Sequence, residues 1–144
     1  MTIRNVFGLV VAAGIGLLAV ASAGVQAQEV GPNKMPVAEW GDEEYHVEVI
    51  PDAKAGTVTL LVYGNHDDLH KAKRKAIDAK GLTVAFKSPA LTVKAAPSPD
   101  KGDPAGKSSR FVGKADGLEK LTKIEGTVSG KVGPKVYSGD FKQK

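Results

Sequence analysis

The chain lacks cysteine altogether and has few aromatic residues, with one tryptophan, three tyrosines and four phenylalanines in 144 residues. Without cysteine it can form neither disulfides nor thiolate metal sites, so its stability must come from an apolar core, alone or with a bound ligand. Neither sign of charge dominates, because 20 basic residues face 16 acidic ones and the formal net charge is +4. This mild basicity falls short of the pattern of nucleic-acid-binding proteins.

Long hydrophobic runs are confined to the N-terminus. Arg4 supplies one positive charge ahead of an uncharged apolar run over residues 6–21, and small residues follow at positions 21–23 and 25–27. This order is typical of a secretory signal peptide, and the run is shorter than the roughly 20 residues that span a bilayer. We therefore expect a signal-peptide helix in residues 1–27, cleavage after Ala27, and a periplasmic or secreted protein with no membrane span.

The remaining chain alternates apolar and polar residues in short segments separated by glycine, proline and aspartate. Residues 28–43 show little periodicity and are expected to form an extended lead-in, with Val37 and Trp40 as possible anchors. Residues 44–144 are expected to form one domain. Alternation predicts strands over residues 44–50, 57–63, 82–87, 91–95, 109–114, 123–132 and 135–141. About seven short strands with turns between them predict an all-β fold, namely an immunoglobulin-like antiparallel β-sandwich.

The first of these strands carries two polar residues on one face. Tyr45, Val47 and Val49 alternate with His46 and Glu48. Period-two alternation indicates one buried and one solvent-facing side, so His46 and Glu48 are expected to face water.

A candidate metal site lies between the second and third predicted strands. His66 and His70 are four residues apart and would share one face of a helix, while Asp67 and Asp68 add carboxylate oxygens. Imidazole with carboxylate suits Zn²⁺ or Cu²⁺. His46 becomes a third imidazole ligand if residues 64–70 fold back over its strand.

A polar connecting loop is the alternative interpretation of this segment. The basic stretch Lys71–Lys75 follows it directly and would repel a cation. The same stretch could instead contact an anionic surface or an acidic partner protein, although a solvated loop explains it as well.

Catalytic patterns are weak in this sequence. Ser108 and Ser109 lie far along the chain from any histidine, and no Gly-x-Ser-x-Gly motif is present. No acid–base pair or cofactor-binding loop can be assembled, so we expect no enzymatic activity.

Four segments carry a resemblance to known proteins: EYHVEVIPDAKAGTVTLLVYG, IDAKGLTVAFK, GDPAGKSSRF and GKVGPKVYSGDF. Over roughly residues 40–142 the chain resembles small exported bacterial β-domain proteins of unassigned function, sometimes found near envelope metal-efflux components. The resemblance implies an envelope-side β-domain and transfers no catalytic residue. Where such proteins handle metal, the position that matches their strand histidine is His46.

The sequence thus leaves two functions open. The first is an exported, non-enzymatic binding or interaction module of the bacterial cell envelope, whose partner is an unidentified envelope protein rather than nucleic acid. The alternative is a periplasmic accessory protein that handles Cu or Zn through His46, His66, Asp67, Asp68 and His70.

Overall fold

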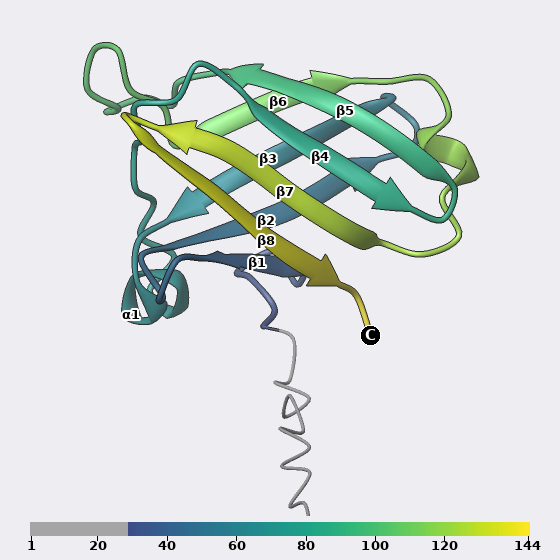
Figure 1. Ribbon diagram of the computed structural model, residues 1–144, viewed down its shortest axis with the longest axis horizontal. Helices are drawn as coiled ribbons and strands as arrows, with labels where there is room; N and C mark the ends of the chain where they lie inside the picture. Colours follow the sequence, from purple (N-terminus) through teal and green to yellow (C-terminus); the bar gives the residue numbers. More distant parts are fainter. Residues whose placement is uncertain (1–28) are drawn as a thin grey trace, which may run out of the picture.

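The structure is a computed structural model and describes residues 29–144 (Figure 1). The predicted signal-peptide helix and its cleavage site lie outside the described residues. Over residues 29–144, no helix has the length and apolar character that crossing a membrane requires.

The fold is all-β, as predicted, with eight strands and very little helix. One five-residue helix, α1 (His66–His70), follows β3, and one 3₁₀ turn, η1 (Leu118–Lys120), precedes β7. The strands are β1 (Val37–Trp40), β2 (Tyr45–Asp52), β3 (Thr57–Tyr63), β4 (Leu82–Lys87), β5 (Ala90–Pro97), β6 (Arg110–Lys114), β7 (Glu125–Val132) and β8 (Lys135–Lys142). β1 lies within the segment for which the sequence predicted an extended lead-in, and both Val37 and Trp40 are buried.

All eight strands are antiparallel members of one sheet, in the order β1-β2-β3-β6-β5-β4-β7-β8. The immunoglobulin-like sandwich is therefore not confirmed, because that fold needs two separate sheets. The two halves of the sheet are joined by a short ladder between β5 and β6, in which Ala96 faces Val112 and Pro97 faces Phe111. The sheet curls through this junction into a nearly closed barrel (Figure 1).

The two edge strands, β1 and β8, lie side by side and pack against each other without a strand ladder between them. The indole Nε1 of Trp40 donates a hydrogen bond to the carbonyl of Val128 at 3.1 Å. The ring of Tyr137 stacks on Trp40 with centroids 5.5 Å apart. At Gly139 an added Cβ would lie 2.2 Å from the carbonyl oxygen of Glu39, so only glycine permits this close approach.

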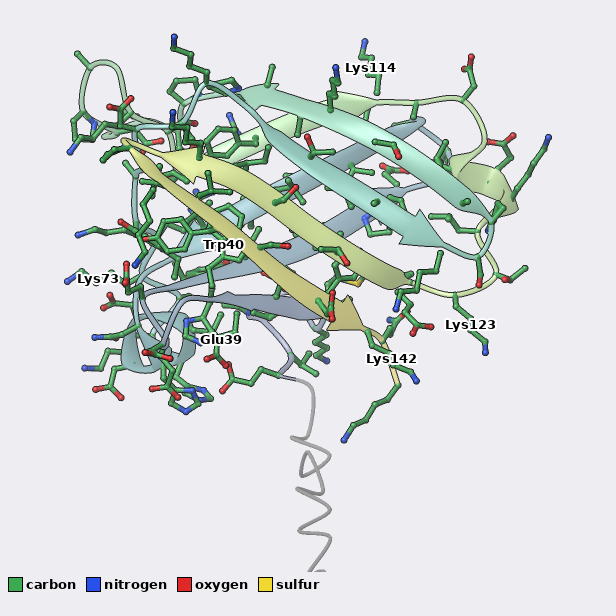
Figure 2. The ribbon with its side chains drawn as sticks, viewed as in Figure 1. Glu39, Trp40, Lys73, Lys114, Lys123 and Lys142 are labelled. Carbon is green, nitrogen blue, oxygen red and sulfur yellow. The ribbon has the colours of Figure 1, made fainter. Side chains whose placement is uncertain are left out.

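The barrel interior is filled by the inward side chains of the alternating strands. Fully buried residues include Trp40, Val47, Val49, Leu60, Val84, Phe111, Val128 and Phe141. Their polar neighbours mostly point to solvent, and Figure 2 shows Lys114, Lys123 and Lys142 extending away from the sheet. β4 follows the expected pattern closely, with Leu82, Val84 and Phe86 inside and Lys87 outside.

β2 departs from that pattern, because both of its faces are buried. His46 and Glu48 are 1% and 0% exposed, so the prediction that they face water is wrong. A segment that we call the N-terminal strap (residues 29–36) covers them. The strap makes a tight turn, in which the amide of Gly31 donates to the carbonyl of Met35 at 2.9 Å. Strand alternation gives the direction of a side chain but does not show what packs over it.

Candidate metal centre

The helix α1 brings two histidines together on one face. Its first turn is capped by Asn65, whose side chain accepts a hydrogen bond from the amide of Asp68 at 3.0 Å. Four residues separate His66 from His70, so their rings meet, with centroids 4.2 Å apart. The two Nε2 atoms are 2.8 Å from each other. Of the two interpretations that the sequence left open, the structure has the helical turn at residues 66–70 rather than a polar loop.

A carboxylate from the N-terminal strap joins the two histidines. Oε1 of Glu29 lies 2.5 Å from Nδ1 of His66. One potential ligand atom from each of Glu29, His66 and His70 lies within 4.8 Å of the others. We call these three residues the Glu–His–His group. Two imidazoles and a carboxylate are a ligand set used for Zn²⁺ in proteins.

His46 stands behind this group, and a backbone carbonyl sets the tautomer of its ring. Its Nδ1 lies 2.8 Å from the carbonyl oxygen of Gly64. A carbonyl only accepts, so Nδ1 carries a hydrogen and donates. In neutral His46 the remaining nitrogen, Nε2, therefore holds a lone pair. Nε2 lies 3.4 Å from Oε2 of Glu29, and the rings of His46 and His66 have centroids 6.3 Å apart.

The second oxygen of Glu29 is the unusual atom of the cluster. Oε2 is buried and accepts no hydrogen bond from any residue in the range 29–144. Buried polar atoms nearly always have a partner, because leaving a carboxylate oxygen unsolvated is costly. When His46 is neutral, Oε2 and Nε2 are two acceptors facing each other. A positive charge, either a proton on Nε2 or a cation, resolves this arrangement.

The contact between His66 and His70 also depends on one proton. Nδ1 of His66 lies against the Glu29 carboxylate, which can only accept, so a neutral His66 that carries its hydrogen on Nδ1 has an acceptor at Nε2. Nε2 of His70 must then carry the hydrogen between them. A metal ion can replace that proton and accept both lone pairs, and Glu29 becomes its third ligand when the carboxylate leaves Nδ1 of His66 for the ion. Nitrogen–zinc bonds of 2.0–2.1 Å in tetrahedral geometry put two nitrogens about 3.3 Å apart, which requires a small rotation of one ring.

The remaining predicted ligands do not join the group. Asp67 is exposed, and its backbone carbonyl accepts a hydrogen bond from the amide of Lys71. Asp68 packs its carboxylate against Gly64 and lines a shallow hollow with Glu44 and Lys75. The two aspartates lie one and two positions after His66, between the histidines, so the geometry of one helical turn directs them to other faces of α1.

The basic stretch after α1 is partly neutralised and partly solvated. Arg74 forms an ion pair with Asp100 in the loop that follows β5. Lys71, Lys73 and Lys75 are exposed, and Figure 2 shows Lys73 extending outward beside α1. Exposed lysines are screened by water and salt, so their repulsion of a cation in the Glu–His–His group is weak.

Glu29 is the site residue that the sequence did not indicate. It is the second residue after the predicted signal peptide and belongs to no periodic segment. Its place depends on the strap folding back, with Val30 bridged to Pro36 and the amide of Val37 bonded to the carbonyl of Glu29 at 3.2 Å. No local sequence pattern encodes that long-range approach to α1.

Comparisons with protein-family models, with curated proteins and with solved structures found no match. The resemblance to small exported β-domain proteins therefore stays an expectation from the sequence. The chemistry of the candidate metal centre rests on the geometry described above.

Proposed function

We propose that this protein is an exported, non-enzymatic binding module of the bacterial cell envelope and that its ligand is Zn²⁺ or Cu²⁺. The observation that carries the proposal is the convergence of Glu29, His66 and His70 from two distant segments, with ligand atoms within 4.8 Å. His46, the third histidine of the chain, lies behind them against Glu29.

The ligand types select the class of ion. Imidazole nitrogens suit Zn²⁺ and Cu²⁺, whereas Ca²⁺ and Mg²⁺ prefer sites built from oxygen alone. Three protein ligands leave one tetrahedral position for water or for a donor from another molecule. The chain has no cysteine to fill it.

The exposure of the site suggests that the ion is cargo rather than a structural element. His70 is exposed, and the side chain of His66 retains 46% of its accessible surface. An ion held there can reach solvent or a partner without unfolding of the barrel. The partner we propose is an envelope protein that gives or takes the ion, consistent with the predicted signal peptide.

The test is calorimetric titration of the protein, purified without a histidine tag, with Zn²⁺ and separately with Cu²⁺. We expect one ion per chain and loss of this binding in His66→Ala/His70→Ala. Asp67→Asn is the matched control, because Asp67 lies on the same helix outside the group, and it should bind as the wild type does. Heats no larger than dilution in the wild type would contradict metal binding and leave only the general proposal of an interaction module.

A further inference from the structure

The most completely bonded buried group in the polar network lies two residues from His46. Glu48 is 0% exposed on the outer face of β2. Its Oε1 accepts the amide of Asn33 at 2.8 Å and that of Met35 at 3.4 Å. Its Oε2 accepts Nδ2 of Asn33 at 2.9 Å and the hydroxyl of Tyr63 at 3.2 Å. Three of these four donors belong to the N-terminal strap.

The strap is fitted to this carboxylate. A Cβ added to Gly31 would lie 2.3 Å from Cδ of Glu48, so the strap backbone passes directly over it. The turn is closed by Gly31 and Lys34, whose carbonyl and amide form a 2.8 Å hydrogen bond. Only glycine at position 31 allows this contact, because any side chain would overlap the carboxylate.

The strap leads straight to the metal centre. Glu29 is two residues before Gly31, and its carboxylate reaches both His46 on β2 and His66 on α1. His46 and Glu48 share one face of β2, so the two contacts of the strap, with Glu48 and with the histidines, are adjacent on the same strand. Releasing the first contact would free the strap that carries Glu29.

We propose that Glu48 is a positioning residue for the metal centre: it fastens the N-terminal strap so that Glu29 can bind the ion held by His66 and His70. This inference rests on the proposed metal binding. Glu48 itself does not touch the ion, and its effect on the ion passes through Glu29. A purely structural role for Glu48 would lower stability without a specific dependence on Glu29.

A double-mutant cycle separates these two roles. Zn²⁺ affinity is measured calorimetrically for the wild type, Glu29→Gln, Glu48→Gln and the double variant, below the unfolding temperature of each. Loss of a residue that orients a ligand typically costs about 10–100-fold in affinity, and we expect Glu48→Gln to fall in that range. In the Glu29→Gln background the same change should cost less than about twofold, because the strap then has no ligand to deliver.

Two further measurements keep the test decisive. Asn33→Ala removes the one side-chain hydrogen bond from the strap to Glu48 and keeps the two from the backbone amides of Asn33 and Met35. It should therefore reproduce part of the loss if Glu48→Gln folds poorly. Glu125→Gln is the matched control on the surface of β7 and should leave the affinity unchanged. Wild-type Zn²⁺ affinity in both Glu48→Gln and Asn33→Ala would overturn this inference and leave the proposed metal binding intact. The same would follow if Glu48→Gln lowered the affinity as much in the Glu29→Gln background as in the wild type. Absence of binding by the wild type would overturn the proposed function with it.

Discussion

β2 and β4 share the same alternating sequence pattern, but their outer faces differ in burial. Along β4, Ala85 and Lys87 are exposed, as alternation predicts. Along β2, His46 and Glu48 occupy equivalent positions and are almost completely buried. The difference is the N-terminal strap, which packs over β2 and has no counterpart over β4 in the described part of the chain.

This difference has an energetic meaning. A polar side chain on an open face keeps its water, whereas one beneath the strap must replace water with protein partners. Glu48 has four such partners and is satisfied, while Oε2 of Glu29 has none among residues 29–144. The face of β2 beneath the strap thus contains two polar networks. The one around Glu48 is complete, and the one around Glu29 would be completed by a cation.

The largest effect should come from removing the carboxylate beneath the strap. Glu48→Ala deletes four hydrogen bonds and leaves the Tyr63 hydroxyl and the Asn33 amide without their acceptor. We expect the free energy of unfolding to fall by about 3 kcal/mol, measured by urea denaturation. The comparison change Glu125→Ala removes a carboxylate whose basic partner, Nζ of Lys87, lies 3.8 Å away, and it should cost less than about 1 kcal/mol. Similar losses for the two variants would show that the strap does not distinguish the faces.

Crowding the strap should have the next largest effect. Gly31→Ala forces a methyl group against Glu48, and the strap must shift or lift. Overpacking of this kind costs typically about 1–3 kcal/mol, again measured by urea denaturation. Faster hydrogen exchange of the Asn33 and Met35 amides should accompany the loss. Unchanged exchange would indicate that the strap accommodates the methyl without leaving Glu48.

Alkaline pH should lower the stability of the protein through Tyr63, which lies beneath the strap beside Glu48. Burial, together with the neighbouring Glu48 carboxylate, raises the pKa of Tyr63 far above its usual value near 10. The folded state therefore holds the phenol proton more tightly than the unfolded state does. The associated stability is complete below pH 10 and is lost as pH rises above it, by up to about 1.4 kcal/mol per pH unit.

The variant Tyr63→Phe isolates this contribution, because it removes the titrating group and keeps the ring. Urea denaturation of both proteins from pH 8 to pH 11 should show the wild type losing stability faster above pH 10. Parallel curves would contradict the assignment of this loss to Tyr63.

The smallest effect is expected on the open face. Nζ of Lys87 lies 3.8 Å from Oε1 of Glu125, and the lysine side chain is 58% exposed. Exposed pairs of this kind contribute about 0–1 kcal/mol and are screened by salt. Lys87→Ala should therefore change the unfolding free energy by less than about 0.5 kcal/mol, and by still less in 1 M salt. A loss comparable to that of Gly31→Ala would mean that the open face is more constrained than its exposure suggests.

Much of the barrel could be predicted from the sequence, because its strands depend on local alternation. Residues 57–63 and 82–87 form strands with the predicted bounds. β1 was not predicted, since its four residues between Pro36 and Gly41 are too few to show a period. The single, nearly closed sheet was not predicted either, because it depends on strand order, and alternation carries no information about which strands pair.

The candidate site divides in the same way. The pairing of His66 with His70 follows from a spacing of four on a helical turn, which the sequence displays. The exclusion of Asp67 and Asp68 follows from the same helical turn, which places them on other faces of α1. The inclusion of Glu29 and the burial of His46 depend on the path of the strap. These are tertiary relationships over 17 or more residues, counted from Glu29 to His46, and no local pattern records them.

The most direct test of a strap-held metal centre is a nitrogen-15 NMR titration with Zn²⁺ that follows the three histidine rings and the strap amides together. We predict that the Nε2 signals of His66 and His70 and the amides of residues 29–35 change in parallel and saturate at one equivalent, while Nδ1 of His46 stays protonated against Gly64. Ring signals that change while the strap amides stay fixed, or no saturable change at all, would contradict the account.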